Sequence, residues 1–208
     1  MKKTLLALTL MSAVVFTALQ AKEEASKEKV ESPKTEKKLT VMDVYKRMGF
    51  ILSDKWSLSP ADKQIDTTGA HKNPAIVHLV GDEDAIGTEY KVIGRGATLE
   101  EVLLPDTMKS MVTMYHCNSY TNCTELWATH YCAKQNQPRF VLNLEATTND
   151  KFVFDCDMKT ELCNSAEDHI HQIVLELSDE DDHLKASYLA WKDKKLRDKH
   201  SIYHFDRQ

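Results

Sequence analysis

The spacing of hydrophobic and polar residues changes once along the chain, near position 51. Between residues 41 and 51 the apolar side chains, among them Val44 and Met48, recur at the three- to four-residue spacing of one face of an α-helix. Thr40 stands directly before this segment and carries a hydroxyl group that can cap the first turn. We therefore predict one short helix over residues 41–51.

Beyond residue 51 the pattern is that of β-strands. Turn-forming residues recur about every ten positions, and the segments between them alternate apolar with polar side chains. About ten such segments are enough to close an antiparallel barrel, which has no exposed edge strand. We predict a mainly β fold, an antiparallel β-barrel of about ten strands preceded by one short helix. The predicted strands cover residues 74–80, 88–94, 98–104, 111–117, 124–132, 139–146, 151–156, 169–177, 183–191 and 201–207.

The N-terminal residues differ in composition from the rest of the chain. Residues 1–21 combine two lysines, a short apolar run and a small-residue cleavage site at Ala21, which is typical of a secretory signal peptide. Residues 22–40 are nearly all Lys, Glu, Ser, Thr and Pro, so we expect a disordered charged linker. A helical arm is the alternative, which Pro33 disfavours. Residues 41–208 then form one domain, expected to be periplasmic or secreted.

Charge and motifs narrow the range of functions. The net charge of −5 and the lack of a basic face argue against a nucleic-acid partner. No later segment is apolar enough to span a membrane, so we expect no integral membrane segment after signal cleavage. GxGxxG, P-loop, GxSxG and HExxH motifs are all missing, and with them the support for common nucleotide-binding, hydrolase and zinc-protease functions. The acidic run at residues 179–182 fits a solvated turn, so we assign no catalytic residue.

Alternation assigns the faces of the strands, because successive side chains of a strand point to opposite sides. In the segment TELWATHYC, His130 and Cys132 share a face with two smaller apolar side chains, and we assign that face to the interior. In the segment HIHQIVLEL, His169 and His171 fall on the more apolar face and are expected to point inward as well. A ligand inside the barrel would then contact Leu126, Ala128, His130, Phe140, Leu142, His169 and His171.

Five cysteines in an exported chain favour disulfides, and the odd number leaves at least one cysteine outside any intrachain pair. Cys117 and Cys123 flank a turn between two predicted strands and can lie opposite each other, close enough to bridge. Cys156 and Cys163 form the second candidate pair. Cys132 is then left unpaired, and we expect a small buried side chain rather than a reactive thiol, because nothing in the sequence places a cation or a helix N-terminus beside it.

The same inward residues support a second hypothesis. His130 and Cys132 on one strand, with His169 and His171 on another, would offer imidazole and thiolate ligands for a tetrahedral zinc or copper site. A single inward histidine could instead ligate haem iron. The simpler alternative is that these side chains are hydrogen-bonded to one another or to neighbours inside the barrel.

Several runs of sequence are similar to those of one protein family. The resemblance covers residues 41–207 and rests most specifically on the runs MVTMYH and THYC…NQPR, with YKVIGRGATLEEVLLPDTMKS, DHIHQIVLEL, HLKASYLAWKDKK and HFDR as weaker matches. The chain thus resembles the DUF1579 group of small bacterial proteins of unknown function, which have a lipocalin-like, calycin-type barrel. The resemblance implies an interior that can hold a small apolar ligand, and it implies no established reaction.

The chain departs from the family pattern at three turns. CNSYTNC stands where the family has a tight turn of the Asp-Gly type, which agrees with a disulfide across that hairpin. Gln135 stands where the family has a glycine before Asn-Gln-Pro, so a turn geometry that depends on glycine is not expected there. Residues 192–195 read Lys-Asp-Lys-Lys where the family has Asp-Gly-Lys.

These observations lead to one leading hypothesis and two alternatives. The leading hypothesis is an exported β-barrel that binds a small hydrophobic ligand in its interior and is not an enzyme. The first alternative is a metal- or haem-binding protein, or an enzyme, that would use zinc, copper or haem held by His130, Cys132, His169 and His171. The second alternative is a filled barrel with a structural or interaction role.

Overall fold

The structure is a computed structural model that describes residues 38–64 and 70–208. The predicted signal peptide, residues 1–21, and most of the predicted linker, residues 22–40, lie outside the described residues. From Lys38 onward the described chain belongs to one structural unit. None of the helices in this described part is long and apolar enough to cross a membrane.

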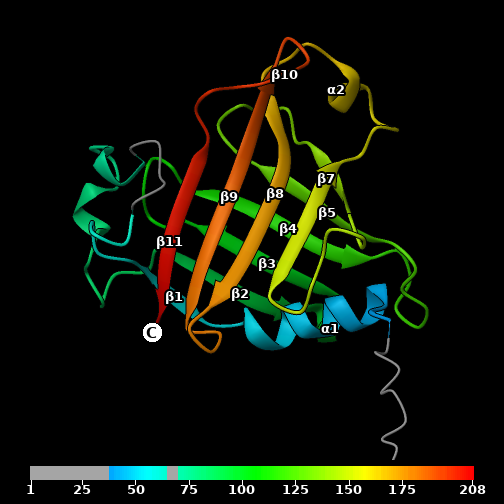
Figure 1. The fold of residues 1–208 in the computed structure, drawn as a ribbon, viewed down its shortest axis with the longest axis horizontal. Helices are drawn as coiled ribbons and strands as arrows, with labels where there is room; N and C mark the ends of the chain where they lie inside the picture. The colour runs from blue at the N-terminus through cyan, green and yellow to red at the C-terminus, as the bar shows by residue number, and fades with distance from the viewer. Residues whose placement is uncertain (1–37, 65–69) are drawn as a thin grey trace, which may run out of the picture. The chain divides into compact units, whose positions relative to one another are not determined.

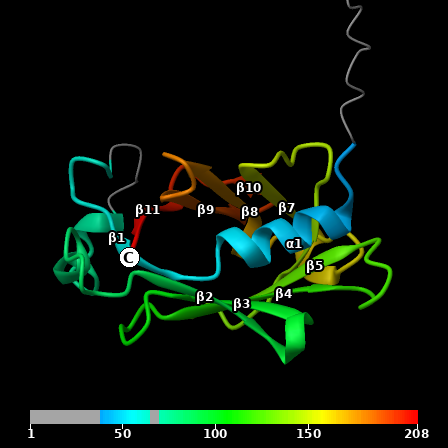
Figure 2. The same cartoon turned by 90° about the horizontal axis from the view of Figure 1, so that it is seen from below.

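Helix α1 (Val41–Ile51) begins at the residue that the sequence predicts, and the predicted residue caps it. Thr40 Oγ1 accepts a hydrogen bond from the Asp43 amide at 3.1 Å, and the Asp43 carboxylate accepts one from the Thr40 amide at 3.3 Å. This reciprocal pair is a capping box. The apolar stripe of the helix, which includes Val44 and Met48, is buried in the core. Figures 1 and 2 show α1 lying across one end of the barrel.

Eleven strands follow α1 in the described chain. They are β1 (Lys55–Leu58), β2 (Thr88–Ile93), β3 (Thr98–Leu103), β4 (Met111–Cys117), β5 (Leu126–Tyr131), β6 (Arg139–Leu142), β7 (Lys151–Cys156), β8 (His169–Ser178), β9 (His183–Lys192), β10 (Lys195–Leu196) and β11 (Ser201–Arg207). The short helices are η1 (Ala70–Lys72), η2 (Val77–Leu79), η3 (Gly94–Gly96) and α2 (Glu161–Asn164).

The long strands form a closed antiparallel barrel. Neighbours pair in the order β9-β11-β1-β2-β3-β4-β5-β6-β7-β8, and β8 pairs in turn with β9, which closes the circle. The two-residue strand β10 pairs only with β9 and stands outside the circle. Closure removes the unpaired edges that an open sheet would expose. The predicted fold class, a mainly β antiparallel barrel of about ten strands with one short N-terminal helix, is confirmed.

The sequence pattern fails at one segment and is imprecise at two others. Residues 74–80, predicted to be a strand, form a turn and helix η2, because the buried Ile76 and Leu79 are three positions apart, which is helical spacing. The strands missing from the prediction are β1 and β10, which are too short to show a period. Strand β6 ends earlier than predicted because Asn143 Oδ1 accepts a hydrogen bond from the Ala146 amide and turns the chain.

Two turns without glycine still adopt a left-handed backbone. Gln135 has a φ angle of 60°, and Asp193 and Lys194 in the β9–β10 turn have φ angles of 53° and 60°. A residue with a Cβ atom reaches this region at a cost of about 1–2 kcal/mol. The expectation that the turn at Gln135 would lack a glycine-type geometry is therefore wrong. Gln135 itself adopts the left-handed backbone conformation that glycine adopts without strain.

Large side chains fill most of the barrel. Fully burying one such side chain stabilises the fold by about 1.5–3 kcal/mol, so a filled interior is the main source of stability. Space for a ligand is therefore expected only where this packing ends. The largest fully buried side chains include Trp56, Tyr115, Tyr188, Phe140, Phe152, Phe154 and Phe205.

A substitution at Gly87 can test the close packing between β1, β2 and β11. A Cβ atom there would lie 2.8 Å from the Leu58 backbone nitrogen and 2.9 Å from the Phe205 ring, so Gly87→Ala should destabilise the fold by about 1–3 kcal/mol. The control is Gly49→Ala in α1, where the new Cβ would lie 3.4 Å from a Val92 methyl group, an ordinary van der Waals contact. This substitution should stabilise the helix by about 0.5–1 kcal/mol, because alanine loses less backbone freedom on folding than glycine. Urea unfolding measures both changes, and equal stability of the two variants would contradict this packing.

Candidate functional site

The structure places five residues of the predicted ligand-binding set in the barrel interior. Strand β5 contributes Leu126, Ala128 and His130, and β6 contributes Phe140 and Leu142. The four apolar members are packed into the buried core, and the cavity that His130 lines does not reach them. His130 is the member of the predicted set that lines a cavity.

This cavity has a volume of about 220 Å³ and opens at the end of the barrel where β4 and β11 begin. Helix α1 lies at the other end of these strands, where Tyr45 Oη donates a hydrogen bond to the Gly96 carbonyl before β3. Apolar and aromatic side chains from five strands or strand ends meet around the cavity. They include Met111, His130, Ile170, Tyr188 and Tyr203.

His130 is the polar group that the cavity exposes to a ligand. Its side chain is buried, and its Nδ1 atom shares a hydrogen bond of 2.9 Å with the Thr113 hydroxyl group. Its Nε2 atom is buried without a hydrogen-bond partner among the described residues. Burial lowers the pKa of His130 to about 4, so the imidazole is neutral near pH 7. A neutral ring with one unpaired nitrogen can accept or donate one hydrogen bond from the cavity.

Behind His130 lies a buried carboxyl group, Glu101 on β3. The hydroxyl groups of Tyr115 and Tyr188 donate to its two oxygens, with a donor–acceptor distance of 2.7 Å for Tyr115. Burial raises the pKa of Glu101, and the hydrogen bonds from Tyr188, Tyr115 and Thr113 oppose that rise. Burial and the nearby Glu101 charge also raise the pKa of both tyrosines well above 10.0. The tyrosines are therefore neutral donors at any ordinary pH.

These groups form one buried polar cluster beside the cavity. Thr113 shares a hydrogen bond with His130, its hydroxyl group lowers the pKa of Glu101, and Glu101 accepts a hydrogen bond from Tyr188, which itself lines the cavity. If the Thr113 hydroxyl donates to the carboxyl group, it must accept from Nδ1–H of His130. We infer that Nε2 then carries the lone pair, so the cavity offers a hydrogen-bond acceptor.

Sequence reasoning missed Glu101, although a signal was present. Leu99, Glu101 and Leu103 alternate along one strand, so a carboxyl group falls on the apolar face that turns inward. An acidic residue at such a position must find donors inside the protein. Which donors these are cannot be read from one strand, since Tyr115 and Tyr188 come from β4 and β9.

The expectation that His169 and His171 point inward is corrected by an irregularity in β8. His169 pairs with Trp191 and Ile170 with Ala190, but the register shifts between Ile170 and Gln172. The extra residue reverses the alternation at the start of β8, because a bulge places two residues opposite one. Ile170 therefore faces the interior, whereas both histidines lie on the Trp191 side of the sheet.

The four predicted metal ligands are therefore not brought together: His130 and Cys132 line the cavity, whereas His169 and His171 lie on the other side of the sheet. His169 Nδ1 lies 2.7 Å from the Glu167 carbonyl oxygen, and His169 Nε2 lies 2.9 Å from His171 Nδ1. The His171 ring stacks on Trp191 with its centroid at 3.8 Å. His130 contacts Thr113 and Tyr188 instead, so no single cation can contact His130 together with the other two histidines.

The cysteines pair as the sequence suggests. Cys117 is bonded to Cys123 and Cys156 to Cys163, with Cα–Cα distances of 5.2 Å and 5.7 Å. Cys132 is the free cysteine. It is partly exposed at the cavity rather than buried, because β5 ends one residue earlier, at Tyr131.

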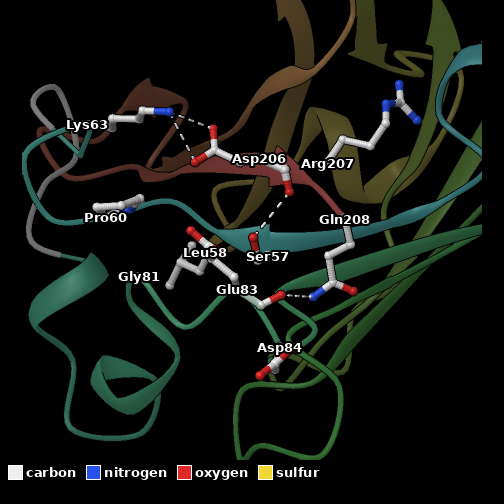
Figure 3. Close-up of a pocket in the computed structure, with 10 residues that line it drawn as sticks. All are labelled: Ser57, Leu58, Pro60, Lys63, Gly81, Glu83, Asp84, Asp206, Arg207 and Gln208. Atoms are coloured by element: carbon white, nitrogen blue, oxygen red, sulfur yellow. Dashed lines mark hydrogen bonds and ion pairs between the residues drawn. The ribbon is translucent and has the colours of Figure 1, made fainter.

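A second cavity, about 690 Å³, lies outside the barrel against β1 and the end of β11. Figure 3 shows that two of its polar side chains already have partners within the protein: the Lys63 ammonium group binds the Asp206 carboxylate at 3.1 Å, and Gln208 Nε2 donates to the Glu83 carbonyl at 2.7 Å. A ligand here would have to break these contacts. The smaller cavity at His130 is therefore the better candidate site despite its size.

The lowered pKa of His130 gives the fold a pH dependence of definite sign. The folded value, about 4, lies below the ordinary value of 6.5, so between these values the unfolded chain binds a proton that the folded chain does not. Acidification from pH 6.5 to 4 should remove up to about 3 kcal/mol of stability through this residue.

Urea unfolding of wild type and His130→Gln between pH 7 and pH 4 measures this effect. The wild type should lose more stability than the variant over that range, while His116→Gln, at a partly exposed histidine, should follow the wild type. Parallel losses in wild type and His130→Gln would contradict a neutral, buried His130.

Comparison with known proteins does not assign this site to a family. No family model, no curated protein and no solved structure was found to match the chain. The function is therefore argued from the cavity, from the buried groups behind it and from the chemistry that they permit.

Proposed function

We propose that the protein is an exported carrier or sensor barrel that binds one small, uncharged, mainly apolar molecule through a hydrogen bond to His130. The observation that carries this proposal is the buried Nε2 atom of His130, which has no partner among the described residues and belongs to a side chain that lines a cavity. Buried polar atoms in proteins are nearly always paired, so an unpaired one beside a cavity points to a ligand or water that completes it.

The size of the cavity limits the ligand. A volume of about 220 Å³ is below the roughly 300–1,000 Å³ of typical ligand pockets and equals that of about seven water molecules. A short-chain alcohol or amide fits, as does one end of a longer chain. A haem group held by His130 would need more room than this cavity offers. The ligand must also keep its apolar part against Met111, Ile170 and Tyr203.

The charge of the site favours a neutral ligand. His130 is neutral, Glu101 is enclosed by its own donors, and the Lys134 ammonium group at the cavity already forms an ion pair of 2.6 Å with Asp168. Lys109 also lines the cavity, but it is exposed to solvent, so a charged head group beside His130 would lose its hydration without gaining a buried counter-charge. A hydroxyl or amide group can instead donate to Nε2 of His130 and leave the rest of the ligand in apolar contact.

Export is part of the same proposal. The two disulfides support an oxidising compartment, because such bonds persist outside the cytosol. The signal-peptide pattern of residues 1–21 is the sequence observation behind it. The closed antiparallel barrel also agrees with the resemblance to the DUF1579 group, and membership of that lipocalin-like family remains a proposal.

Binding of small probes measured by NMR tests this function. Hexanol, hexanamide, hexanoate and hexylammonium have the same chain length and differ in head group. Hexanol and hexanamide should shift the amide signals of Met111 and Ile170 in a saturable way, at least tenfold more tightly than the two charged probes. His130→Phe should weaken their binding about tenfold, the loss expected for one hydrogen bond of about 1–1.5 kcal/mol.

Two further variants control this experiment. His116→Phe makes the same exchange on the other face of the barrel wall and should leave binding unchanged. Ile170→Trp should fill the cavity and abolish binding while the spectrum remains that of a folded protein. The proposal fails if none of the four probes binds saturably, which would favour the filled barrel, or if His130→Phe binds the neutral probes as tightly as wild type.

A further inference from the structure

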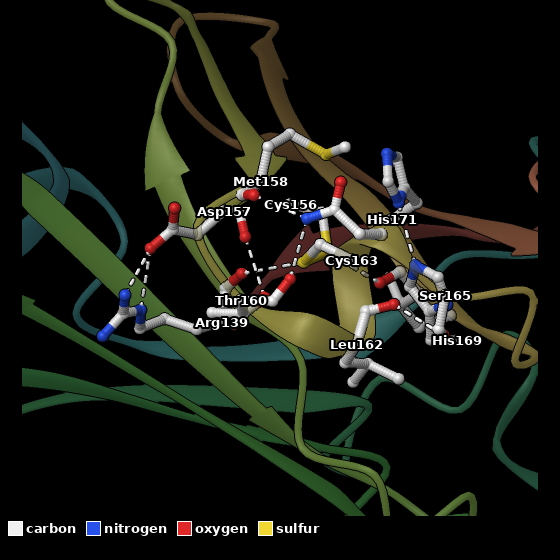
Figure 4. The surroundings of a disulfide bond; sticks show 12 residues. Arg139, Cys156, Asp157, Met158, Thr160, Leu162, Cys163, Ser165, His169 and His171 are labelled. Atoms are coloured by element: carbon white, nitrogen blue, oxygen red, sulfur yellow. Dashed lines mark hydrogen bonds and ion pairs between the residues drawn. A yellow bond between two sulfur atoms is a disulfide. The ribbon is translucent and has the colours of Figure 1, made fainter.

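A cluster of metal-ligating side chains lies away from the His130 cavity, beside α2 (Figure 4). Cys156 Sγ and one ring nitrogen each of His169 and His171 lie within 4.8 Å of one another. Cys163 is bonded to Cys156 and so brings a second sulfur atom to the cluster. Cys156, Cys163 and His169 are buried, and His171 is partly exposed. Three ligand side chains of zinc chemistry therefore already lie close together, and Cys163 adds a fourth next to them through its bond to Cys156.

The two imidazole rings are already oriented for a cation. The Nδ1 atom of His169 is turned to the Glu167 carbonyl oxygen at 2.7 Å, so Nδ1 carries the proton and Nε2 carries the lone pair. A histidine bound to a metal ion is commonly held by this type of backbone contact. Nε2 of His169 faces Nδ1 of His171 at 2.9 Å, and stacking on Trp191 fixes the second ring. Nδ1 of His171 donates this hydrogen bond, so its proton moves to Nε2 of the same ring when Nδ1 binds a cation.

The distances are close to those of a tetrahedral zinc site. With Zn–N bonds of about 2.0 Å and Zn–S bonds of about 2.3 Å, the ligand atoms of such a site lie roughly 3.3–3.8 Å apart, the two sulfurs being the most widely separated. The two histidine nitrogens would separate by a few tenths of an ångström, and the Cys156 sulfur would approach by about 1 Å. Side-chain rotations are sufficient for movements of this size.

The disulfide is what separates this cluster from a metal site, because a thiolate binds zinc and a disulfide sulfur does not. We propose that reduction of the Cys156–Cys163 disulfide converts the cluster into a zinc site of two thiolates and two imidazoles. A dithiol reductant supplies two electrons and two protons, its own sulfurs form a disulfide, and Cys156 and Cys163 become thiols. Zn²⁺ then displaces the two thiol protons and binds both sulfurs with His169 and His171.

The other disulfide offers an internal comparison. Cys117 and Cys123 also bridge a turn, but the histidine beside them, His116, directs Nδ1 to the Cys117 carbonyl oxygen and packs edge-on against Trp127. Among the described residues, this bridge belongs to no group of three potential metal ligands. Redox-dependent zinc binding is therefore specific to Cys156–Cys163. It also does not depend on a ligand at His130, because none of its four residues lines that cavity.

Zinc and cobalt binding by untagged full-length protein, oxidised or reduced with a phosphine under anaerobic conditions, tests the proposal. Cys132→Ser serves as the background that removes the free thiol. The reduced protein should bind one Zn²⁺ per chain at least 100-fold more tightly than the oxidised protein, measured by competition with a chromophoric chelator. Reduced protein with Co²⁺ should show thiolate-to-cobalt charge-transfer bands and the visible bands of a tetrahedral ion.

Variants separate this site from adventitious binding. His171→Gln, at a partly exposed position, should stay folded and weaken reduced-state zinc binding at least tenfold. The Cys156→Ser/Cys163→Ser double variant should lose the cobalt charge-transfer bands, and the Cys117→Ser/Cys123→Ser double variant should keep them. Equal zinc affinity of oxidised and reduced protein overturns the proposal. So do cobalt bands that survive His171→Gln unchanged, or loss of the circular dichroism spectrum on reduction that zinc does not restore.

Discussion

The burial of one carboxyl group organises the interior of this barrel. Removing a carboxylate from water costs several kcal/mol unless hydrogen bonds replace its hydration. Hydroxyl groups on β4 and β9 supply those bonds to Glu101, through Tyr115, Thr113 and Tyr188. Because these strands stand apart in the barrel order, the network ties different parts of the wall together. His130 joins it through Thr113, so the group that faces the cavity is held in place by the same buried acid.

One irregular residue in β8 separates two chemical environments. If β8 alternated without interruption, His169 and His171 would face the interior beside His130. The register shift between Ile170 and Gln172 instead turns both histidines to the outer side, next to the Cys156–Cys163 disulfide. The interior is left with one neutral imidazole and an apolar cavity. The other side of β8 carries two imidazoles, which meet the buried Cys156–Cys163 disulfide and form with it a ligand set of a different chemistry.

Much of the fold could be predicted from local pattern. The helix at 41–51 with its Thr40 cap, most strands and the inward side of β5 follow from periods that a few neighbouring residues display. The strand predicted at residues 74–80 was wrong, because the two buried residues of this apolar run have the spacing of a helix. The candidate site was predicted only in part: His130 lies inside, as its strand indicates, whereas the contribution of Glu101 depends on partners from distant strands.

The sequence by itself determined the antiparallel barrel class, through the number and alternation of its strands, together with the capped helix and the flanking positions of both cysteine pairs, because each of these follows from a pattern that residues close in the chain display. Tertiary structure alone decided which side of the wall His169 and His171 occupy and which hydroxyl groups meet Glu101. It also decided that, of the residues predicted to bind a ligand, His130 is the one that lines the cavity beside the packed core. These outcomes depend on how strands far apart in sequence align across the barrel, and a shift of one residue in that alignment reverses the side on which a group is presented.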